Sequence, residues 1–147
     1  MVIRLEQDES VNDIEIKITY KTKDKYLDRF VSMIKNYDEK IECYFDDRIK
    51  LINVSDVYYI ESLKNKTFVF CEKTKYHTKL RLYQLIEKLS GFAFIQISKY
   101  CIMNTNKLDS VRPLFNSRME VILSNGVRLY VNRKYLAGMK QIYMEVE

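Results

Sequence analysis

Apolar and polar residues alternate in several short runs of the chain, and this alternation predicts a protein built mainly from β-strands. Every second residue is apolar at 14–20, and 94–97 shows the same period, as expected for half-buried strands. Shorter apolar-rich runs predict further strands at 2–5, 41–45, 48–52, 57–62, 67–71, 75–78, 120–123 and 127–131.

Turn-forming residues separate the predicted strands. Asn125-Gly126 is the strongest signal, because it lies between two apolar runs and both residues tolerate a positive φ. Asp46-Asp47 and Asn116-Ser117 indicate two more turns, and 63–66 reads as a basic hairpin loop. The chain is therefore expected to form short strands joined by tight turns.

Helical periodicity occurs in three places. The first helix would follow Asp24 and run to about Asn36, with an apolar stripe that either packs on the N-terminal strands or binds a partner. A short helix is expected at 82–89, with Gly91 after its end, and a terminal helix after Tyr135. The stripe of the first helix consists of Leu27, Phe30, Val31 and Ile34.

The length and composition suit a folded protein of one domain, or of one domain with a small attached subdomain. The chain has 147 residues, 47% of them hydrophobic, with 3 Gly and 1 Pro, so a flexible linker between domains is not expected. No apolar run approaches the ~20 residues needed to cross a bilayer. The N-terminus becomes charged at Arg4, unlike a signal peptide, and a cytoplasmic location is therefore expected.

Catalytic and metal-binding motifs are not found in the sequence. The single histidine, His77, lies in a predicted strand, and there is no phosphate-binding loop, Gly-rich dinucleotide turn or metal motif. Cys43, Cys71 and Cys101 are odd in number and far apart; we interpret them as buried reduced thiols, with redox sensing as the alternative. We predict no enzymatic activity, no cofactor and no metal.

Positive charge is concentrated in the C-terminal part of the chain. The sequence has 25 Lys and Arg against 20 Asp and Glu, a formal net charge of +5. Residues 88–144 contain nine basic and two acidic residues, so this segment carries +7 and the rest carries −2. A localised basic face of this kind suits a polyanionic partner such as nucleic acid.

Basic and amide residues cluster in loops at the ends of predicted strands. Arg and Lys can bind guanine edges or phosphates, and Asn can pair with adenine, so these loops are candidate DNA contacts. By composition alone, ordinary solvated surface charges explain them equally well. The candidates are Lys64, Asn65, Lys66, Ser98, Lys99, Arg118, Asn132, Arg133 and Lys134.

Four segments carry a resemblance to a known family through their order and spacing. They are 57–62 (VYYIES), 94–104 (FIQISKYCIMN), 123–126 (LSNG) and 131–135 (VNRKY). Together with the helix between the first two, they resemble the LytTR family of bacterial DNA-binding domains over residues 41–143. Many members have Arg, His and Ser where this chain has Gln96, Ser98 and Tyr100. The DNA sequence preference therefore does not transfer, because base readout depends on side-chain identity.

The resemblance implies a fold and a mode of action. The fold would be mainly β with a few helices, an elongated array of small antiparallel β-sheets, in a DNA-binding domain at 41–147. A small α+β segment of two strands and a helix, 1–40, would precede it as a dimerisation or signal element. Strand-connecting loops would read duplex DNA, with Lys99, Lys134 and 64–66 toward base edges or phosphates.

The resemblance also implies partners. A cytoplasmic bacterial transcription regulator of this kind would bind tandem imperfect DNA repeats as a homodimer. This chain looks like the stand-alone subgroup, which resembles response regulators without their receiver domain and is often encoded with a small membrane protein that restrains it. The alternative is a protein-interaction module whose basic face binds an acidic partner or a membrane-associated regulator.

Overall fold

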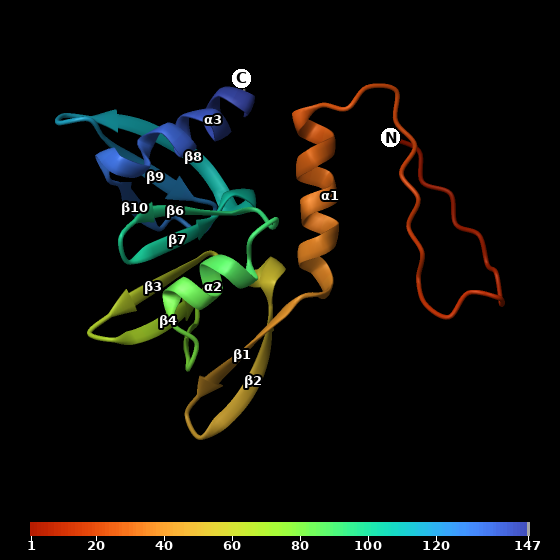
Figure 1. Cartoon of the computed structure of the whole chain (residues 1–147), viewed down its shortest axis with the longest axis horizontal. Helices are drawn as coiled ribbons and strands as arrows, with labels where there is room; N and C mark the ends of the chain where they lie inside the picture. The colour runs from red at the N-terminus through yellow and green to blue at the C-terminus, as the bar shows by residue number, and fades with distance from the viewer. Residues whose placement is uncertain (147) are drawn as a thin grey trace.

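The computed structural model describes the backbone of residues 1–146 and the side chains of residues 1–142. Over these residues the chain forms ten β-strands and three α-helices, which confirms the prediction of a mainly β fold with a few helices (Figure 1). The strands are β1 Lys40–Phe45, β2 Arg48–Asn53, β3 Tyr59–Leu63, β4 Lys66–Phe70, β5 Lys75–Thr78, β6 Phe94–Ser98, β7 Cys101–Asn104, β8 Leu108–Leu114, β9 Arg118–Leu123 and β10 Arg128–Val131. The α-helices are α1 Lys25–Asp38, α2 Leu82–Lys88 and α3 Leu136–Val146, and the short 3-10 helices are η1 Val54–Asp56, η2 Thr105–Lys107 and η3 Arg133–Tyr135.

The strands form two antiparallel sheets. The first has seven strands in the order β2-β1-β5-β4-β3-β7-β6, and the second has three in the order β10-β9-β8. Strands β1 and β5 share a single residue pair, Tyr44 with His77, so the first sheet is nearly divided there. In Figure 1 the hairpins follow one another from the three-stranded sheet to the β1–β2 hairpin, as expected for an elongated array of small sheets.

Two apolar cores lie on opposite faces of the β3–β7 pair. Ile60 and Ile102 point into a core that is covered by Leu85 of α2 and by Leu89, the residue that follows this helix. Met103, the next residue along β7, points into a second core that includes Val121, Val131 and Met139. All four residues of β7 are buried because both of its faces are covered, and successive side chains alternate between the two cores.

The first helix begins where the sequence predicts. The Asp24 carboxylate accepts a hydrogen bond of 2.9 Å from the Leu27 backbone N–H, and α1 ends at Asp38. The stripe on α1 is half-buried, and the helix contacts η1 and β2. Two residues of the stripe, Leu27 and Val31, also line a hollow together with residues of the N-terminal segment. The helix therefore packs on the β domain, and its stripe also faces the N-terminal segment, although that segment forms no strand.

The two strands predicted at 2–5 and 14–20 are not formed. Residues 1–24, all within the described part of the chain, contain no strand, and Ile14 is 86% exposed. A strand requires a neighbour for its backbone N–H and C=O groups, and this segment has none within one chain. For the single protomer, the prediction that residues 1–40 form two strands and a helix is therefore wrong about the strands.

Positive φ angles fix the tight turns. Lys64 and Asn65 have φ of 49° and 65° between the paired residues Leu63 and Lys66, as in a type I′ turn. The turn at Asn125-Gly126 differs from the prediction, because only Gly126 adopts a positive φ there, 88°. It is a three-residue loop closed by a 2.8 Å hydrogen bond from the Gly126 N–H to the Leu123 carbonyl.

Candidate nucleic-acid interface

Four chain connections meet along one edge of the molecule, on the left-hand side of Figure 1. They are the β3–β4, β6–β7 and β8–β9 turns and the junction of β10 with η3. We call them together the loop edge. All nine candidate residues predicted from the sequence lie in these connections or at the strand ends beside them.

The strand register places the first two turns side by side. Strand β3 runs antiparallel to β7 with Glu61 opposite Cys101, so the end of β3 lies next to the start of β7. The Ser62 N–H donates a 2.8 Å hydrogen bond to the Tyr100 carbonyl and extends this contact to the turns themselves. The Lys64-Asn65 turn therefore lies beside Lys99.

A second hydrogen bond joins the two sheets at the same edge. The Asn132 N–H donates to the Ile97 carbonyl at 2.9 Å, so the β10–η3 junction lies beside the end of β6. Val131 is paired with Met119, which brings Arg118 at the start of β9 next to that junction. Backbone hydrogen bonds thus hold all four connections in one row, independently of any side-chain contact.

The β3–β4 turn presents three cationic side chains. Lys64 and Lys66 are exposed, and the Asn65 carbonyl accepts a 2.9 Å hydrogen bond from the Arg81 guanidinium. Arg81 precedes α2 and was not among the residues predicted from the sequence, because its contact with Asn65 spans 16 positions along the chain. The type I′ backbone holds the two lysines at the tip of a β-ribbon, and the guanidinium of Arg81 lies beside them.

The β6–β7 turn exposes a lysine and an aromatic ring together. The Lys99 ammonium lies 5.4 Å from the centre of the Tyr100 ring, and both side chains are exposed. The Ser98 hydroxyl accepts a 3.3 Å hydrogen bond from the Tyr100 N–H, so this predicted site residue also shapes the turn. A register shift between Gln96 and Ser98 precedes the turn, and such irregularities redirect the side chains that follow.

Three arginines lie on the outer face of the three-stranded sheet. Arg118 is 5.4 Å from the centre of the Tyr130 ring, which supports a structural pairing for this predicted site residue. Arg112 and Arg128 lie 3.2 and 3.9 Å from the carboxylate of Glu120, whose side chain is only 3% exposed. Arg112 and Arg128 were not among the site residues predicted from the sequence. Alternation around the Asn125-Gly126 hairpin could have placed Arg128 on the face of Arg118.

The predicted cluster Asn132–Lys134 begins a 3-10 helix. The Asn132 carbonyl accepts a 2.9 Å hydrogen bond from the Tyr135 N–H, which closes the turn. The sequence left open whether the strand continues or a helix starts here. In a 3-10 helix three residues make one turn, so Asn132, Arg133 and Lys134 point in different directions, and all three are exposed.

Comparison with known families identifies this architecture. The family model of the LytTr DNA-binding domain, which describes the sequences of its members, matches residues 47–144 of this chain. This chain belongs to the LytTR family. Within the solved structures, the LytTr domain of a Bacillus cereus protein described as a methyl-accepting/DNA response regulator shows the same fold, with a TM-score of 0.67 and 23% identity. The match covers 72% of this chain and 97% of that domain.

Curated LytTR relatives are bacterial regulatory proteins. The sensory transduction protein LytT of Enterococcus faecalis is 29% identical over 103 residues, covering 70% of this chain and 43% of the relative. The transcriptional regulatory protein LytR of Staphylococcus aureus is 29% identical over 108 residues, covering 74% and 44%. The LytTR chain described here therefore spans less than half the length of these relatives.

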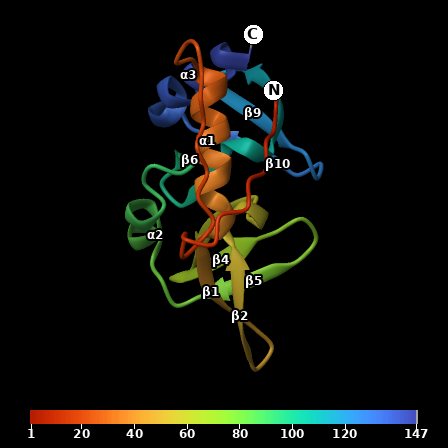
Figure 2. The same cartoon turned by 90° about the vertical axis from the view of Figure 1, so that its right-hand side faces the viewer.

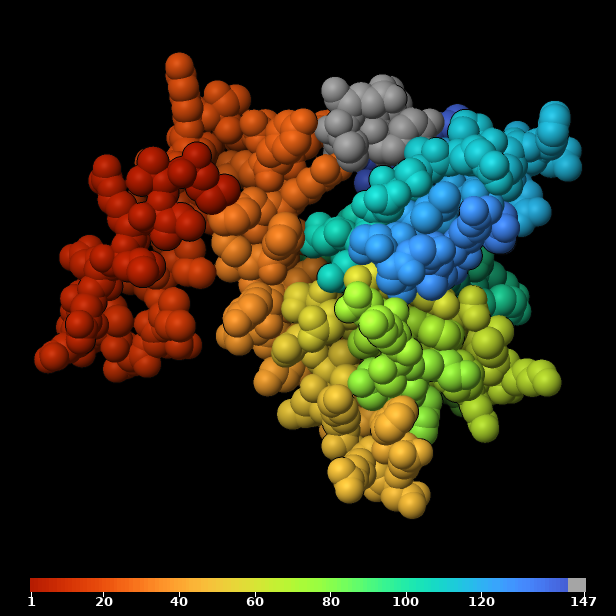
Figure 3. All heavy atoms as spheres, turned by 180° about the vertical axis from the view of Figure 1, so that it is seen from behind, coloured from red at the N-terminus to blue at the C-terminus, as the bar shows by residue number. Residues whose placement is uncertain are grey.

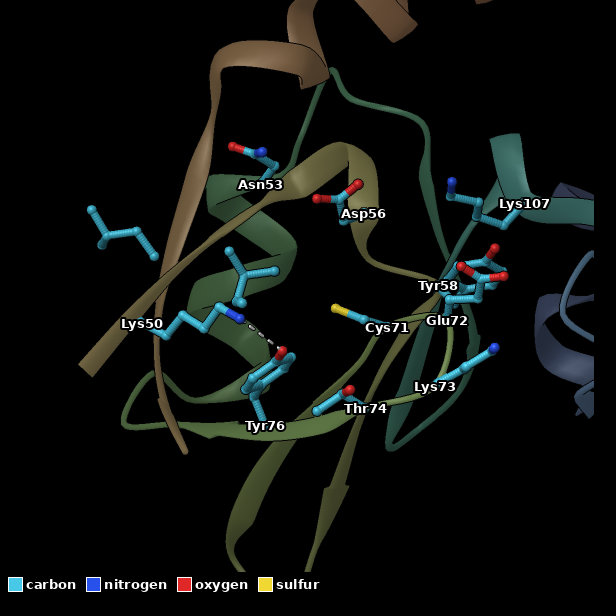
Figure 4. A pocket seen from close by; sticks show the side chains of 12 residues that line it. Lys50, Asn53, Asp56, Tyr58, Cys71, Glu72, Lys73, Thr74, Tyr76 and Lys107 are labelled. Atoms are coloured by element: carbon cyan, nitrogen blue, oxygen red, sulfur yellow. Dashed lines mark hydrogen bonds between the residues drawn. The ribbon is translucent and has the colours of Figure 1, made fainter. Parts of the chain in front are cut away.

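A mixed-charge hollow lies at the other end of β4, away from the loop edge of this LytTR domain (Figure 4). Lys50, Asp56, Glu72 and Lys107 line it among other residues, and the Lys107 ammonium lies 4.9 Å from the centre of the Tyr58 ring. Acidic and basic groups alternate around this hollow. It therefore lacks the uniform positive charge of the turns at the loop edge.

The thiols and the histidine sit in structural environments. Burial raises the pKa of Cys43 and of Cys101 to about 12, and burial also raises the pKa of the half-buried Cys71 to about 11. The His77 ring stacks on Tyr44 with 5.4 Å between the ring centres. Within the residues described by the structure, no group of histidines, cysteines and carboxylates is placed to hold a metal ion, and no helix is long and apolar enough to span a membrane.

Proposed function

We propose that this LytTR protein is a bacterial transcription regulator that binds specific duplex DNA sequences through the loop edge. The observation that supports this most directly is the pair of backbone hydrogen bonds, Ser62 to Tyr100 and Asn132 to Ile97, at that edge. They bring basic connections from both sheets into one row in a chain of a DNA-binding family. A row of rigid, cationic turns suits the phosphate backbone and groove edges of duplex DNA.

The turns have different proposed roles. Lys64, Lys66 and Lys99 are exposed at the tips of β-ribbons, and the major groove, about 12 Å wide, admits such a ribbon. We assign these lysines, together with Lys134, to base edges or adjacent phosphates. Arg118 stacks on an aromatic ring, so we assign it to a phosphate contact that this ring orients.

Several further properties belong to the same proposal. Two protomers would bind tandem imperfect repeats, so that equivalent loop edges enter successive major grooves. Residues 41–147 would form the DNA-binding unit, and 1–40 a dimerisation or signal element. The protein would act in the cytoplasm, and a small membrane protein would restrain it.

Selection of bound duplexes from a random pool tests this function. At about 150 mM salt, where non-specific phosphate binding is weak, the full chain should enrich a short sequence in two repeats. A scrambled version of the enriched duplex serves as the matched control, and it should bind at least about a hundredfold more weakly. A pool that stays random, with equal binding of both duplexes, would overturn the proposal and favour the alternative of an acidic protein partner.

A further inference from the structure

Residues 1–24 stand away from both apolar cores. They form two arms joined by a turn, in which the Val11 N–H donates to the Asp8 carbonyl at 3.4 Å, and they lie beside α1 (Figures 1 and 2). Figure 3 shows this segment, in red, as a separate lobe of the surface. Leu5 is 94% exposed and Ile16 is 58% exposed. Such a cluster of exposed apolar side chains marks an interaction surface on a folded protein.

The second arm, which contains residues 14–18, also lacks a hydrogen-bonding partner for its backbone. Residues 14–18 alternate apolar and polar side chains as a strand does, yet the structure assigns no strand there. A hollow of about 930 Å³ separates the two arms and is lined by both, including Leu5 and Ile14. The edge of the 14–18 segment is therefore open, and its N–H and C=O groups can pair with another strand.

We propose that residues 14–18 pair antiparallel with the same residues of a second copy of this chain, about a two-fold axis at Ile16. This register places Glu15 opposite Lys17 of the second copy, and Lys17 opposite its Glu15. It also places Ile14 opposite Ile18. Both charged pairs are attractive and the remaining pairs are apolar, so the segment is complementary to itself.

Other symmetric registers are less favourable. Centring the pairing on Lys17 places two lysines directly opposite each other, and centring it on Glu15 does the same with two carboxylates. Like charges in opposed positions destabilise an antiparallel pair. A shift by a single residue would turn the isoleucines of one copy to the opposite face. Charge and face together select the register centred on Ile16.

The apolar face of this pair has a place to pack. Ile18 and Tyr20 already line a hollow together with Leu27 and Val31 of α1. Pairing would align Ile14, Ile16 and Ile18 of both copies on that face and extend the half-buried stripe of α1. This contact between two copies adds detail to the proposed function. It rests on that proposed function only for the expectation that two protomers act together on DNA.

Sedimentation of the full chain without DNA tests the contact. The wild-type protein should be a dimer, and Glu15→Lys or Lys17→Glu should each raise the dimer Kd at least about tenfold, because two attractive pairs become repulsive. An equimolar mixture of the two variants should regain dimerisation as a heterodimer, since each lysine again faces a carboxylate. Glu87→Lys makes the same charge change on an exposed face of α2 and should leave the Kd unchanged.

Cysteine cross-linking tests the register. Ile16→Cys places two thiols across the axis at a distance that a disulfide spans, whereas Thr19→Cys would face Asp13 of the second copy and should not cross-link to itself. A monomeric wild-type protein, unchanged Kd values for both charge variants, or no heterodimer in the mixture would overturn the inference. Because these assays contain no DNA, a failure of DNA binding would leave their results untouched.

Discussion

Replacement of Lys99 by alanine separates base reading from simple charge at the loop edge. Lys99 lies in the β6–β7 turn with its ammonium 5.4 Å from the Tyr100 ring centre. An exposed cation–π contact of this kind is worth about 0.5–1 kcal/mol, a small part of the roughly 5–15 kcal/mol that stabilises a typical domain. The variant should therefore remain folded, and any loss of DNA binding would come from the interface itself.

The size of the expected loss follows from the contact type. A lysine that binds a guanine edge contributes about 1–3 kcal/mol of discrimination, which corresponds to a factor of about 5–150 in Kd. A lysine that only neutralises phosphate weakens binding to all sequences alike. We expect Lys99→Ala to weaken binding to the selected duplex within that range and to change binding to the scrambled duplex by a much smaller factor.

Fluorescence anisotropy with labelled selected and scrambled duplexes measures both quantities. Lys107→Ala is the matched control, because it removes the same charge beside the Tyr58 ring, away from the loop edge. Its effect on both duplexes should be within about twofold, since charges beyond a Debye length of about 10 Å are largely screened. Equal losses for the two variants, or equal losses of Lys99→Ala on both duplexes, would refute the base-reading role.

Three further predictions concern the scaffold. Gly126→Val should lower the free energy of unfolding by about 1–2 kcal/mol in urea denaturation, because a φ of 88° at this position is strained for a β-branched residue. An unchanged denaturation midpoint would contradict the positive φ of this turn. Asn104→Ala should destabilise by about 1–3 kcal/mol in the same assay, since it removes the 2.9 Å hydrogen bond from the Asn104 amide to the buried Val57 carbonyl, and a neutral effect would show that the carbonyl finds another donor. Burial raises the pKa of Cys43 and Cys101 from 9.0 to about 12, so the folded state binds these two protons more tightly than the unfolded state does. The resulting contribution to the free energy of unfolding is therefore fully present below about pH 9 and is lost progressively as the pH rises toward 12. Both should react with a thiol reagent at pH 8 only after unfolding, and rapid labelling of the native protein would contradict their burial.

Local signals were sufficient to predict most elements of the fold. The Asp24 cap, the Asp46-Asp47 turn and the two runs that flank this turn depend on residues close in sequence, and all are present in the structure. Strand β8, Leu108–Leu114, was not predicted. The segment 14–20 shows the limit of this reasoning. Alternation reports which side chains share a face, but a strand also needs a hydrogen-bonding neighbour, which the sequence of one protomer does not reveal.

The candidate site was predictable in its parts but not in its assembly. Each loop was recognisable from its own basic and amide residues. Their alignment depends on contacts between distant positions, such as the hydrogen bond from Asn132 to Ile97, which no local pattern encodes. Arg81 and Arg112 were missed for the same reason, because their places beside Asn65 and Glu120 depend on tertiary contact and strand register.

Amide chemical-shift mapping with the selected duplex tests most directly whether the loop edge binds DNA. Titration of the labelled full chain should shift the amide signals of Lys64, Asn65, Lys99 and Lys134, while the β1–β2 turn at Asp46-Asp47, remote from that edge, stays unchanged. The scrambled duplex should produce smaller shifts at the same positions. Shifts centred on the β1–β2 turn or on α2, or identical shifts with both duplexes, would contradict specific DNA recognition by the loop edge.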